Sequence, residues 1–362
     1  MGWVTNFSST ISSISPLNTP LSVSVKDLEF GPDQLGEGFG FHYLELGKDP
    51  DKQSPVRCTL VQYKPDNATD FYDRPGLLLV HGMTDYFFQD HVARYFHARG
   101  YAVYGLDMRK CGRSWREGQT WHHVTDQSFY DLDITAAATV ITNAHPTVTA
   151  FGHSTGGLNV TMWASRLRRA SVDMPEGPEA VLHAKLAGVV LNSPWFGLQF
   201  GAATRFLATR VFPTLGKLNP SLLLPGGINP LYGKSLHASE DGEWDYNLEL
   251  KPLTPRPKYL TWLNGVVRSI REFQSGHYCT GVPTLLLASD KHHFSKGKIT
   301  EATRTSDVIL KPSQMREHAR KANPDVDIVV LKDAVHDVFL SRRHVREHAL
   351  AITAEWLEEN VK

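Results

Sequence analysis

Cysteine, surplus charge and long apolar runs are all scarce in this 362-residue chain. The three cysteines, Cys58, Cys111 and Cys279, are far apart and form no C-x-x-C pair, which argues against a disulfide framework or a zinc site. Acidic and basic residues balance at 38 each, so no net charge attracts nucleic acid or an anionic membrane. No apolar run approaches the roughly 18 residues that a membrane span needs. We therefore expect a cytoplasmic protein that binds a small, roughly neutral molecule, without nucleic-acid partner or integral membrane segment.

Short apolar runs that alternate with helical patterns make up most of the chain. Their hydrophobicity is continuous rather than alternating, which is typical of strands buried on both faces of a mostly parallel sheet. The runs are VRCTLVQY (56–63), GLLLVHG (76–82), YAVYGLD (101–107), TVTAFG (147–152), LAGVVLNS (186–193), VPTLLLAS (282–289) and VDIVVLKD (326–333). Helices are predicted at about 127–143 and near the C-terminus, where Val345, Ala349, Ile352 and Trp356 share one face. The pattern predicts an α/β fold with a doubly wound sheet.

The composition changes between Pro194 and Gly276, where prolines, glycines and aromatic residues accumulate and no clear strand occurs. In a parallel α/β sheet, a segment inserted after the carboxyl end of a strand lies over the active-site crevice. We therefore divide the chain into a catalytic core of residues 30–194 and 276–362, a cap of residues 195–275, and an N-terminal extension of residues 1–29.

The segment FGHSTGG (151–157) places Ser154 between two glycines, directly after an apolar strand and before a helical pattern. G-x-S-x-G in this context is typical of a nucleophile elbow, because the sharp strand-to-helix turn needs glycines around an exposed serine. A serine hydroxyl is a weak nucleophile unless a base takes its proton and a carboxylate orients that base. Ser154 is therefore the predicted nucleophile.

The base is predicted to be His336, which follows the last strand and precedes the final helix. His153 adjoins the nucleophile, and we expect its side chain to point elsewhere. The order serine, acid, histidine that is typical of this fold leaves the carboxylates of residues 155–335 as candidates for the acid. Asp290, at the end of a strand, and Asp307, at the start of DVILKP, both fit. The local pattern does not separate them.

An oxyanion hole needs two backbone N–H groups that point at the developing negative charge. The residue after the nucleophile, Thr155, and Met83, in the loop after LLLVHG, are the predicted donors. Metal and cofactor sites are not expected: HVREH (344–348) fits H-x-x-E-H, but its third ligand would have to come from the few residues that follow. No glycine-rich dinucleotide motif precedes a helix.

Three segments resemble the serine α/β-hydrolases of the monoacylglycerol lipase and lysophospholipase-like group, which is also described as serine aminopeptidase-like. They are the segment that begins LLLVHGMTDYFF, the segment FGHSTGG and the segment VHDVFLS. The resemblance covers most of the chain from about residue 40 onward and is weak in the cap. It implies an α/β-hydrolase fold with Ser154 as nucleophile and His336 as base. In relatives the acid stands in a pattern similar to DVILKP, so the resemblance favours Asp307 over Asp290.

The resemblance and the predicted triad together imply a serine hydrolase that cleaves a carboxylic ester through an acyl-enzyme. The apolar and aromatic cap suggests an ester with a lipid-like or otherwise apolar acyl chain, since ligand sites are mostly apolar with a few polar anchors. Two alternatives stay open. One is a peptidase, amidase or lactonase that uses the same triad, and the other is a non-catalytic ligand receptor that keeps the fold.

Overall fold

The computed structural model describes residues 22–361 apart from 67, 200, 202–205, 220–221, 225–229, 241, 277 and 295–296, and gives no account of side chains 208 and 217. Most of the predicted N-terminal extension, residues 1–21, therefore lies outside the described residues.

In the described part of the chain, one sheet of nine strands runs through the centre, in the order β1-β2-β3-β5-β4-β6-β7-β8-β9. The pairs from β1 to β5 in this order are antiparallel, and every pair from β5 to β9 is parallel. This parallel region confirms the predicted α/β class. The strands are β1 (Gly31–Pro32), β2 (Phe39–Gly47), β3 (Val56–Tyr63), β4 (Gly76–Val80), β5 (Ala102–Asp107), β6 (Val148–His153), β7 (Leu186–Asn192), β8 (Thr284–Ser289) and β9 (Asp327–Leu331).

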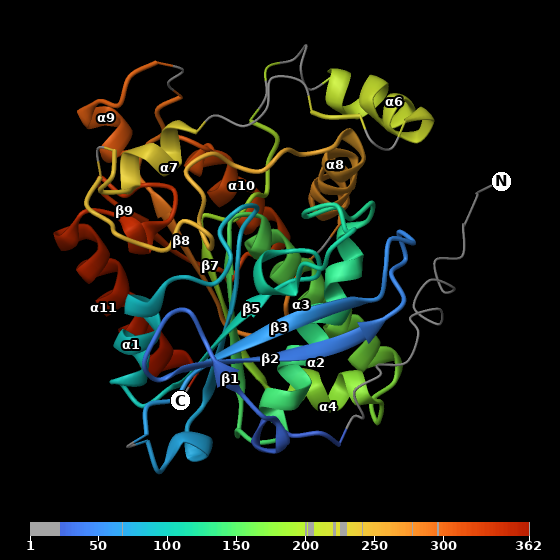
Figure 1. The fold of residues 1–362 in the computed structure, drawn as a ribbon, viewed down its shortest axis with the longest axis vertical. Coiled ribbons are helices and arrows are strands. Elements are labelled where there is room, and N and C mark those ends of the chain that lie inside the picture. Colours follow the sequence, from blue (N-terminus) through green and yellow to red (C-terminus); the bar gives the residue numbers. More distant parts are fainter. Residues whose placement is uncertain are drawn as a thin grey trace.

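Helices cover both faces of the sheet (Figure 1). One face packs against α1 (Asp90–His97) and α11 (Arg343–Asn360), and the other against α2 (Tyr130–Thr142), α3 (Thr155–Asp173) and α4 (Pro178–Lys185). Consecutive residues of β4 show why the strands are apolar throughout. Leu77 and Leu79 belong to the core cluster on the side of α1 and α11, whereas Leu78 and Val80 belong to the cluster on the side of α2, α3 and α4. Because both clusters are buried, every position of such a strand must be apolar.

The seven strands predicted from apolar runs correspond to β3 to β9, each with ends within about two residues of the prediction. The sequence reasoning missed β1 and β2. Most residues of β2 are only half-buried, so the continuous apolar run that marks the other strands is absent. β2 lies near the antiparallel edge, where one side of a strand can face water.

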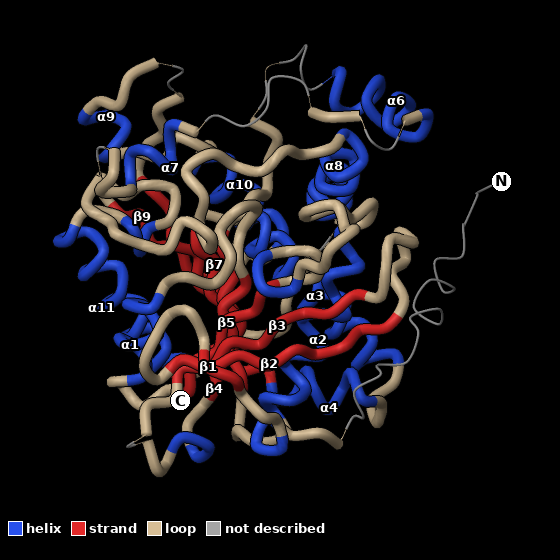
Figure 2. Tube along the Cα trace, in the orientation of Figure 1, coloured by secondary structure: helices blue, strands red, loops and turns tan. Residues whose placement is uncertain are grey.

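The segment between β7 and β8 consists of helices, loops and isolated bridges in its described residues (Figure 2). Its helices are α6 (Phe212–Leu218), α7 (Leu231–Leu236) and α8 (Leu260–Ser275), with a π-helical turn (Leu207–Val211) before α6. They lie at the upper end of the molecule in Figure 1, above β7 and β8. The apolar face of α8, which includes Trp262 and Val266, joins the core cluster of α2 and α3. Two more helices, α9 (Glu301–Arg304) and α10 (Pro312–Ala322), lie between β8 and β9.

Candidate active site

A sharp turn between β6 and α3 carries Ser154. The residue has φ 53° and ψ −115°, a backbone conformation that residues other than glycine rarely adopt. The glycines on either side permit close packing: a Cβ on Gly156 would lie 2.3 Å from the carbonyl oxygen of His81, and one on Gly152 would lie 2.6 Å from the Cα of Gly157. The elbow is therefore a consequence of local sequence, since only glycine fits where α3 meets the end of β4.

The structure brings Ser154, His336 and Asp307 together in one hydrogen-bonded chain. The Ser154 Oγ lies 2.9 Å from Nε2 of His336, and Nδ1 of His336 lies 2.9 Å from Oδ2 of Asp307. All three side chains are buried, with Asp307 fully enclosed. This is the geometry in which imidazole can accept the serine proton while a carboxylate stabilises the resulting imidazolium.

Asp307 reaches the histidine because the chain returns to the end of β8 after a long excursion. The Asp307 N–H donates to the carbonyl of Lys291, and the His293 N–H donates to the carbonyl of Asp307, at 3.1 and 2.9 Å. Oδ1 of Asp307 accepts the backbone N–H groups of Ile309 and Leu310, both at 2.8 Å. These two bonds hold Oδ1, so that Oδ2 faces His336.

Asp290 occupies a different environment, although it directly follows β8. Its Oδ1 accepts the backbone N–H of Asp333 at 2.9 Å, and its other oxygen lies 4.0 Å from the ammonium of Lys291. The side chain is about one-third exposed. Of the two carboxylates that the local pattern left open, the geometry thus joins Asp307 to the histidine and leaves Asp290 in a surface loop.

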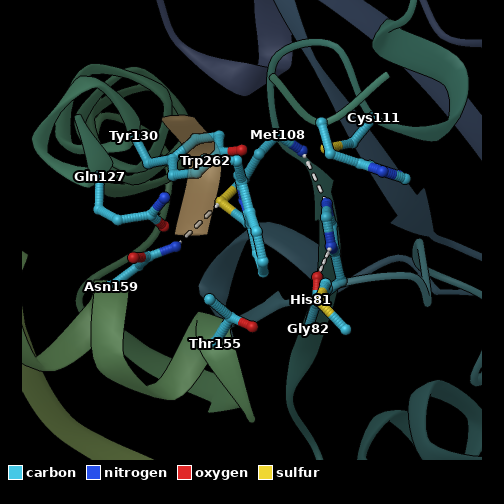
Figure 3. A pocket seen from close by; sticks show the side chains of 11 residues that line it. His81, Gly82, Met108, Cys111, Gln127, Tyr130, Thr155, Asn159 and Trp262 are labelled. Atoms are coloured by element: carbon cyan, nitrogen blue, oxygen red, sulfur yellow. Dashed lines mark hydrogen bonds between the residues drawn. The ribbon is translucent and has the colours of Figure 1, made fainter. Parts of the chain in front are cut away.

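The two predicted oxyanion donors, Met83 and Thr155, line one small pocket. Thr155 is the first residue of α3, where a backbone N–H has no acceptor within the helix. The turn that carries Met83 is held by His81, whose Nε2 accepts the N–H of Met108 at 3.1 Å and whose Nδ1 donates to the carbonyl of Gly82 at 2.7 Å (Figure 3). An imidazole that accepts at one nitrogen and donates at the other is neutral, so His81 adds no positive charge to this pocket.

The pocket extends from the oxyanion donors into the space between α2, α3 and α8 (Figure 3). It contains about 240 Å³ of space outside atoms, with some solvent at its mouth included. The lining is largely apolar or aromatic, with a smaller polar part. The lining residues are His81, Gly82, Met83, Met108, Cys111, His122, Gln127, Tyr130, Thr155, Asn159 and Trp262.

A family model described as serine aminopeptidase, S33, matches residues 74–342, which is well over half of the chain. The chain belongs to this family. The match confirms the resemblance that the sequence motifs indicated. No curated protein matches the chain.

Solved structures of other members of this fold superimpose along most of the chain. The monoacylglycerol lipase of Paleococcus ferrophilus has a TM-score of 0.56 at 20% identity, over 80% of this chain and 96% of that one. A soluble variant of the monoglyceride lipase of Saccharomyces cerevisiae, in complex with a substrate analogue, has a TM-score of 0.59 at 15% identity, over 96% and 100%. At these identities the similarity establishes the α/β-hydrolase fold, which confirms that prediction.

Asn192 is a site residue of this serine aminopeptidase-family chain that the sequence reasoning missed. Its Nδ2 donates to Asp337 at 2.7 Å and its Oδ1 accepts the N–H of Val338 at 3.1 Å, so it clamps the loop just after His336. Its backbone carbonyl accepts the N–H of Ser154 at 3.0 Å. Asn192 therefore links the nucleophile turn to the histidine loop. Its place at the carboxyl end of a predicted strand was the signal that could have identified it.

A group of buried charged and titratable side chains lies close to His336. Nε2 of His153 lies 3.3 Å from Asp85, and the ammonium of Lys251 lies 3.8 Å from the same carboxylate. Burial favours a higher pKa for Asp85, but the positive charge of Lys251 and the nearby histidines lower it below the usual value. The ring of His153 lies 4.9 Å from that of His336, nearer the site than expected, and burial lowers the pKa of His153.

Asp85, His153 and Asp337 also bring three ligand-type atoms within 4.8 Å of one another, the arrangement that a metal ion would need. Protein groups already engage these atoms. Lys251 and His153 contact Asp85, and Asn192 binds the carboxylate of Asp337. A cation would have to displace these contacts.

Within the described residues, no helix is both long and apolar enough to cross a membrane.

Proposed function

We propose that this protein is a serine hydrolase that cleaves carboxylic esters through an acyl-enzyme. The observation that carries the proposal is the buried chain of hydrogen bonds from Ser154 through His336 to Asp307, which begins at a residue in a strained backbone conformation. Strain of this kind persists where the surrounding structure enforces it, and it is concentrated at functional sites.

The mechanism follows from the positions of these groups. Oγ of Ser154 attacks the ester carbonyl while Nε2 of His336 takes its proton, and Asp307 stabilises the imidazolium. The N–H groups of Met83 and Thr155 bind the developing oxyanion. His336 then returns the proton to the leaving alcohol. Water, deprotonated by the same histidine, attacks the acyl-enzyme and releases the acid and the free serine.

An acyl chain with a mainly apolar stem fits the pocket best. Met83, Met108, Tyr130 and Trp262 are among its apolar and aromatic lining residues. Trp262 belongs to α8, within the segment 195–275 that we propose as a cap, so the cap would contribute directly to substrate selection. The names of the fold relatives, monoacylglycerol and monoglyceride lipase, agree with an ester substrate.

An aminopeptidase is the second candidate, because the family description names that activity. An aminopeptidase needs a free carboxylate to bind the substrate ammonium. Asp85 is a buried carboxylate near His336, but it already interacts with Lys251 and His153. This favours the ester.

The first experiment is covalent labelling by a fluorophosphonate together with hydrolysis of p-nitrophenyl esters from acetate to palmitate. We expect the wild type to react in both assays and Ser154→Ala to react in neither. Ser165→Ala, a buried serine on the same helix, is the matched control and should behave as wild type. Cleavage of leucine p-nitroanilide without ester hydrolysis would select the aminopeptidase. Absence of labelling and of turnover on both substrates would refute the hydrolase and favour a receptor.

A further inference from the structure

The pocket beside the oxyanion donors has a polar patch on its wall, made by Gln127, Asn159 and Thr155. Both amide atoms of Gln127, Oδ1 of Asn159 and Oγ1 of Thr155 are buried and have no hydrogen-bond partner among the described residues. The three residues are only 2%, 2% and 4% exposed. A buried polar atom without a partner costs about 1 to 3 kcal/mol, so native proteins contain few of them. Several in the lining of one pocket mark a place where a bound molecule, either a water or a group of the substrate, supplies the partners.

The three side chains come from two elements that the fold brings together. Thr155 and Asn159 are four residues apart on α3 and share one face of that helix. Gln127 lies in the 3-10 turn just before α2. In Figure 3 the amide ends of Gln127 and Asn159 lie near each other on one side of the pocket. The amide nitrogen of Asn159 donates to the sulfur of Met108 at 3.9 Å, and a thioether is a weak acceptor.

This patch lies on the acyl side of the reaction. Thr155 contributes both its backbone N–H, as a proposed oxyanion donor, and its hydroxyl, as a member of the patch. Both proposed oxyanion donors line the pocket, whereas Ser154 and His336, which must protonate the leaving alcohol, are not among its described lining residues. The leaving group must stay near His336. The part of the ester that enters this pocket is therefore the acyl chain.

The hydrogen-bonding groups of the pocket suit a neutral polar group rather than an anion. The patch offers donors from the Gln127 amide and the Thr155 hydroxyl, and acceptors from all three side chains. His81 is neutral, as its two hydrogen bonds require. Burial and the nearby Lys258 hold the pKa of His122 well below its usual value, so this lining residue is neutral as well. A carboxylate or phosphate would meet no cation on this lining, whereas a hydroxyl group can both donate and accept.

We propose that Gln127, Asn159 and Thr155 form a subsite for an acyl chain that carries a hydroxyl group close to the ester carbonyl. The inference rests on the proposed ester hydrolysis and narrows its substrate class. An acyl chain without the hydroxyl leaves the patch unpaired. Sites built to bind a hydroxyl group discriminate strongly against the analogue that lacks it. We expect a preference of about five- to tenfold, which is the effect of one net hydrogen bond.

The experiment compares kcat/KM for p-nitrophenyl butyrate and both enantiomers of p-nitrophenyl 3-hydroxybutyrate, each corrected for its rate of hydrolysis by hydroxide. Gln127→Leu, Asn159→Leu and Thr155→Val each remove polar atoms from the patch, and Thr155→Val keeps the backbone N–H. The matched control is Gln62→Leu, because Gln62 is a buried glutamine of β3 with an unpartnered oxygen that does not line the pocket. Thermal melts show that each variant is folded.

The expected result is that the wild type and Gln62→Leu prefer one 3-hydroxybutyrate enantiomer, and that Gln127→Leu and Asn159→Leu lose this preference while they still hydrolyse the butyrate. Thr155→Val should lose the preference as well, and its rate with butyrate is not used as a control, because Thr155 is also a proposed oxyanion donor. Equal or faster turnover of the plain butyrate by the wild type overturns the subsite and leaves the proposed function intact, provided that Ser154→Ala abolishes the activity. A preference that survives all three substitutions also overturns it. Failure of the wild type to hydrolyse either ester and to react with a fluorophosphonate overturns both proposals.

Discussion

Replacing Asp307 by asparagine removes the proposed triad charge and almost nothing else. In the structure, Oδ1 accepts two backbone N–H groups, those of Ile309 and Leu310, and Oδ2 faces Nδ1 of His336. Asparagine has only one acceptor oxygen, and the two backbone donors will bind it. Its NH2 group must then face His336. Because an NH2 group donates, Nδ1 must accept, and the proton of the neutral imidazole moves to Nε2, which can no longer accept the proton of Ser154.

The size of the effect follows from the same contacts. The opposite amide orientation would place the NH2 group against two buried N–H donors, at about 1 to 3 kcal/mol for each donor left unpaired. Together this is about 2 to 6 kcal/mol, which favours the inactive tautomer by a factor of roughly 30 to 10⁴. The substitution also removes the negative charge that stabilises the imidazolium. We therefore expect kcat to fall by about 10³ to 10⁴.

Steady-state kinetics with p-nitrophenyl butyrate at pH 7 would measure this loss, with a thermal melt to show that Asp307→Asn is folded. The control is Asp290→Asn, the same change at a carboxylate that binds only a surface loop and lies near Lys291. Its kcat should stay within about threefold of wild type, since exposed ion pairs contribute little. A loss below tenfold in Asp307→Asn, or an equal loss in both variants, would refute the assignment of the acid.

Three further substitutions test the packing and charges around the site. Gly156→Ala should lower the free energy of unfolding by about 2 kcal/mol or more in urea titrations, because its Cβ would overlap backbone oxygens at the end of β4. Asn192→Ala should lower kcat by about tenfold or more with little change in KM, because it removes two of the hydrogen bonds that hold the loop after His336, those to Asp337 and from Val338. Burial lowers the pKa of Lys258 from 10.5 to about 7, so the unfolded chain binds more protons between these values and stability rises with pH across that window. Lys258→Met should therefore raise the free energy of unfolding by about 2 to 4 kcal/mol at pH 6, after the loss of the hydrogen bond to His122 is subtracted, and by less at pH 9. A lower free energy of unfolding at both pH values would contradict this.

The sequence predicted much of the fold because the parallel strands of an α/β protein are buried on both faces. Each of β3 to β9 is a continuous apolar run, and this pattern needs no knowledge of distant residues. β2 was missed because its residues are mostly half-buried, so its sequence lacks that pattern. The elbow could also be predicted, since the glycines that fit against β4 lie within a few residues of Ser154.

The choice of acid depended on information that the local pattern does not contain. Asp290 directly follows β8, as expected for an acid at the sheet edge, whereas Asp307 comes after a long excursion. The backbone hydrogen bonds of Asp307 with Lys291 and His293 return it to that edge. The resemblance to relatives favoured Asp307, and the structure supplies the physical reason.

What the sequence determined by itself is the set of features that arise from neighbouring residues: the strands, the helix faces and the strained turn at Ser154. Tertiary structure alone decided which distant groups meet. It placed Asp307 rather than Asp290 against His336, joined Asn192 to the histidine loop, and brought Gln127, Asn159 and Thr155 into the lining of one pocket. Backbone propensity and hydrophobic period act over a few residues, whereas contacts between segments depend on how the sheet and helices pack, and that packing is set by the whole core.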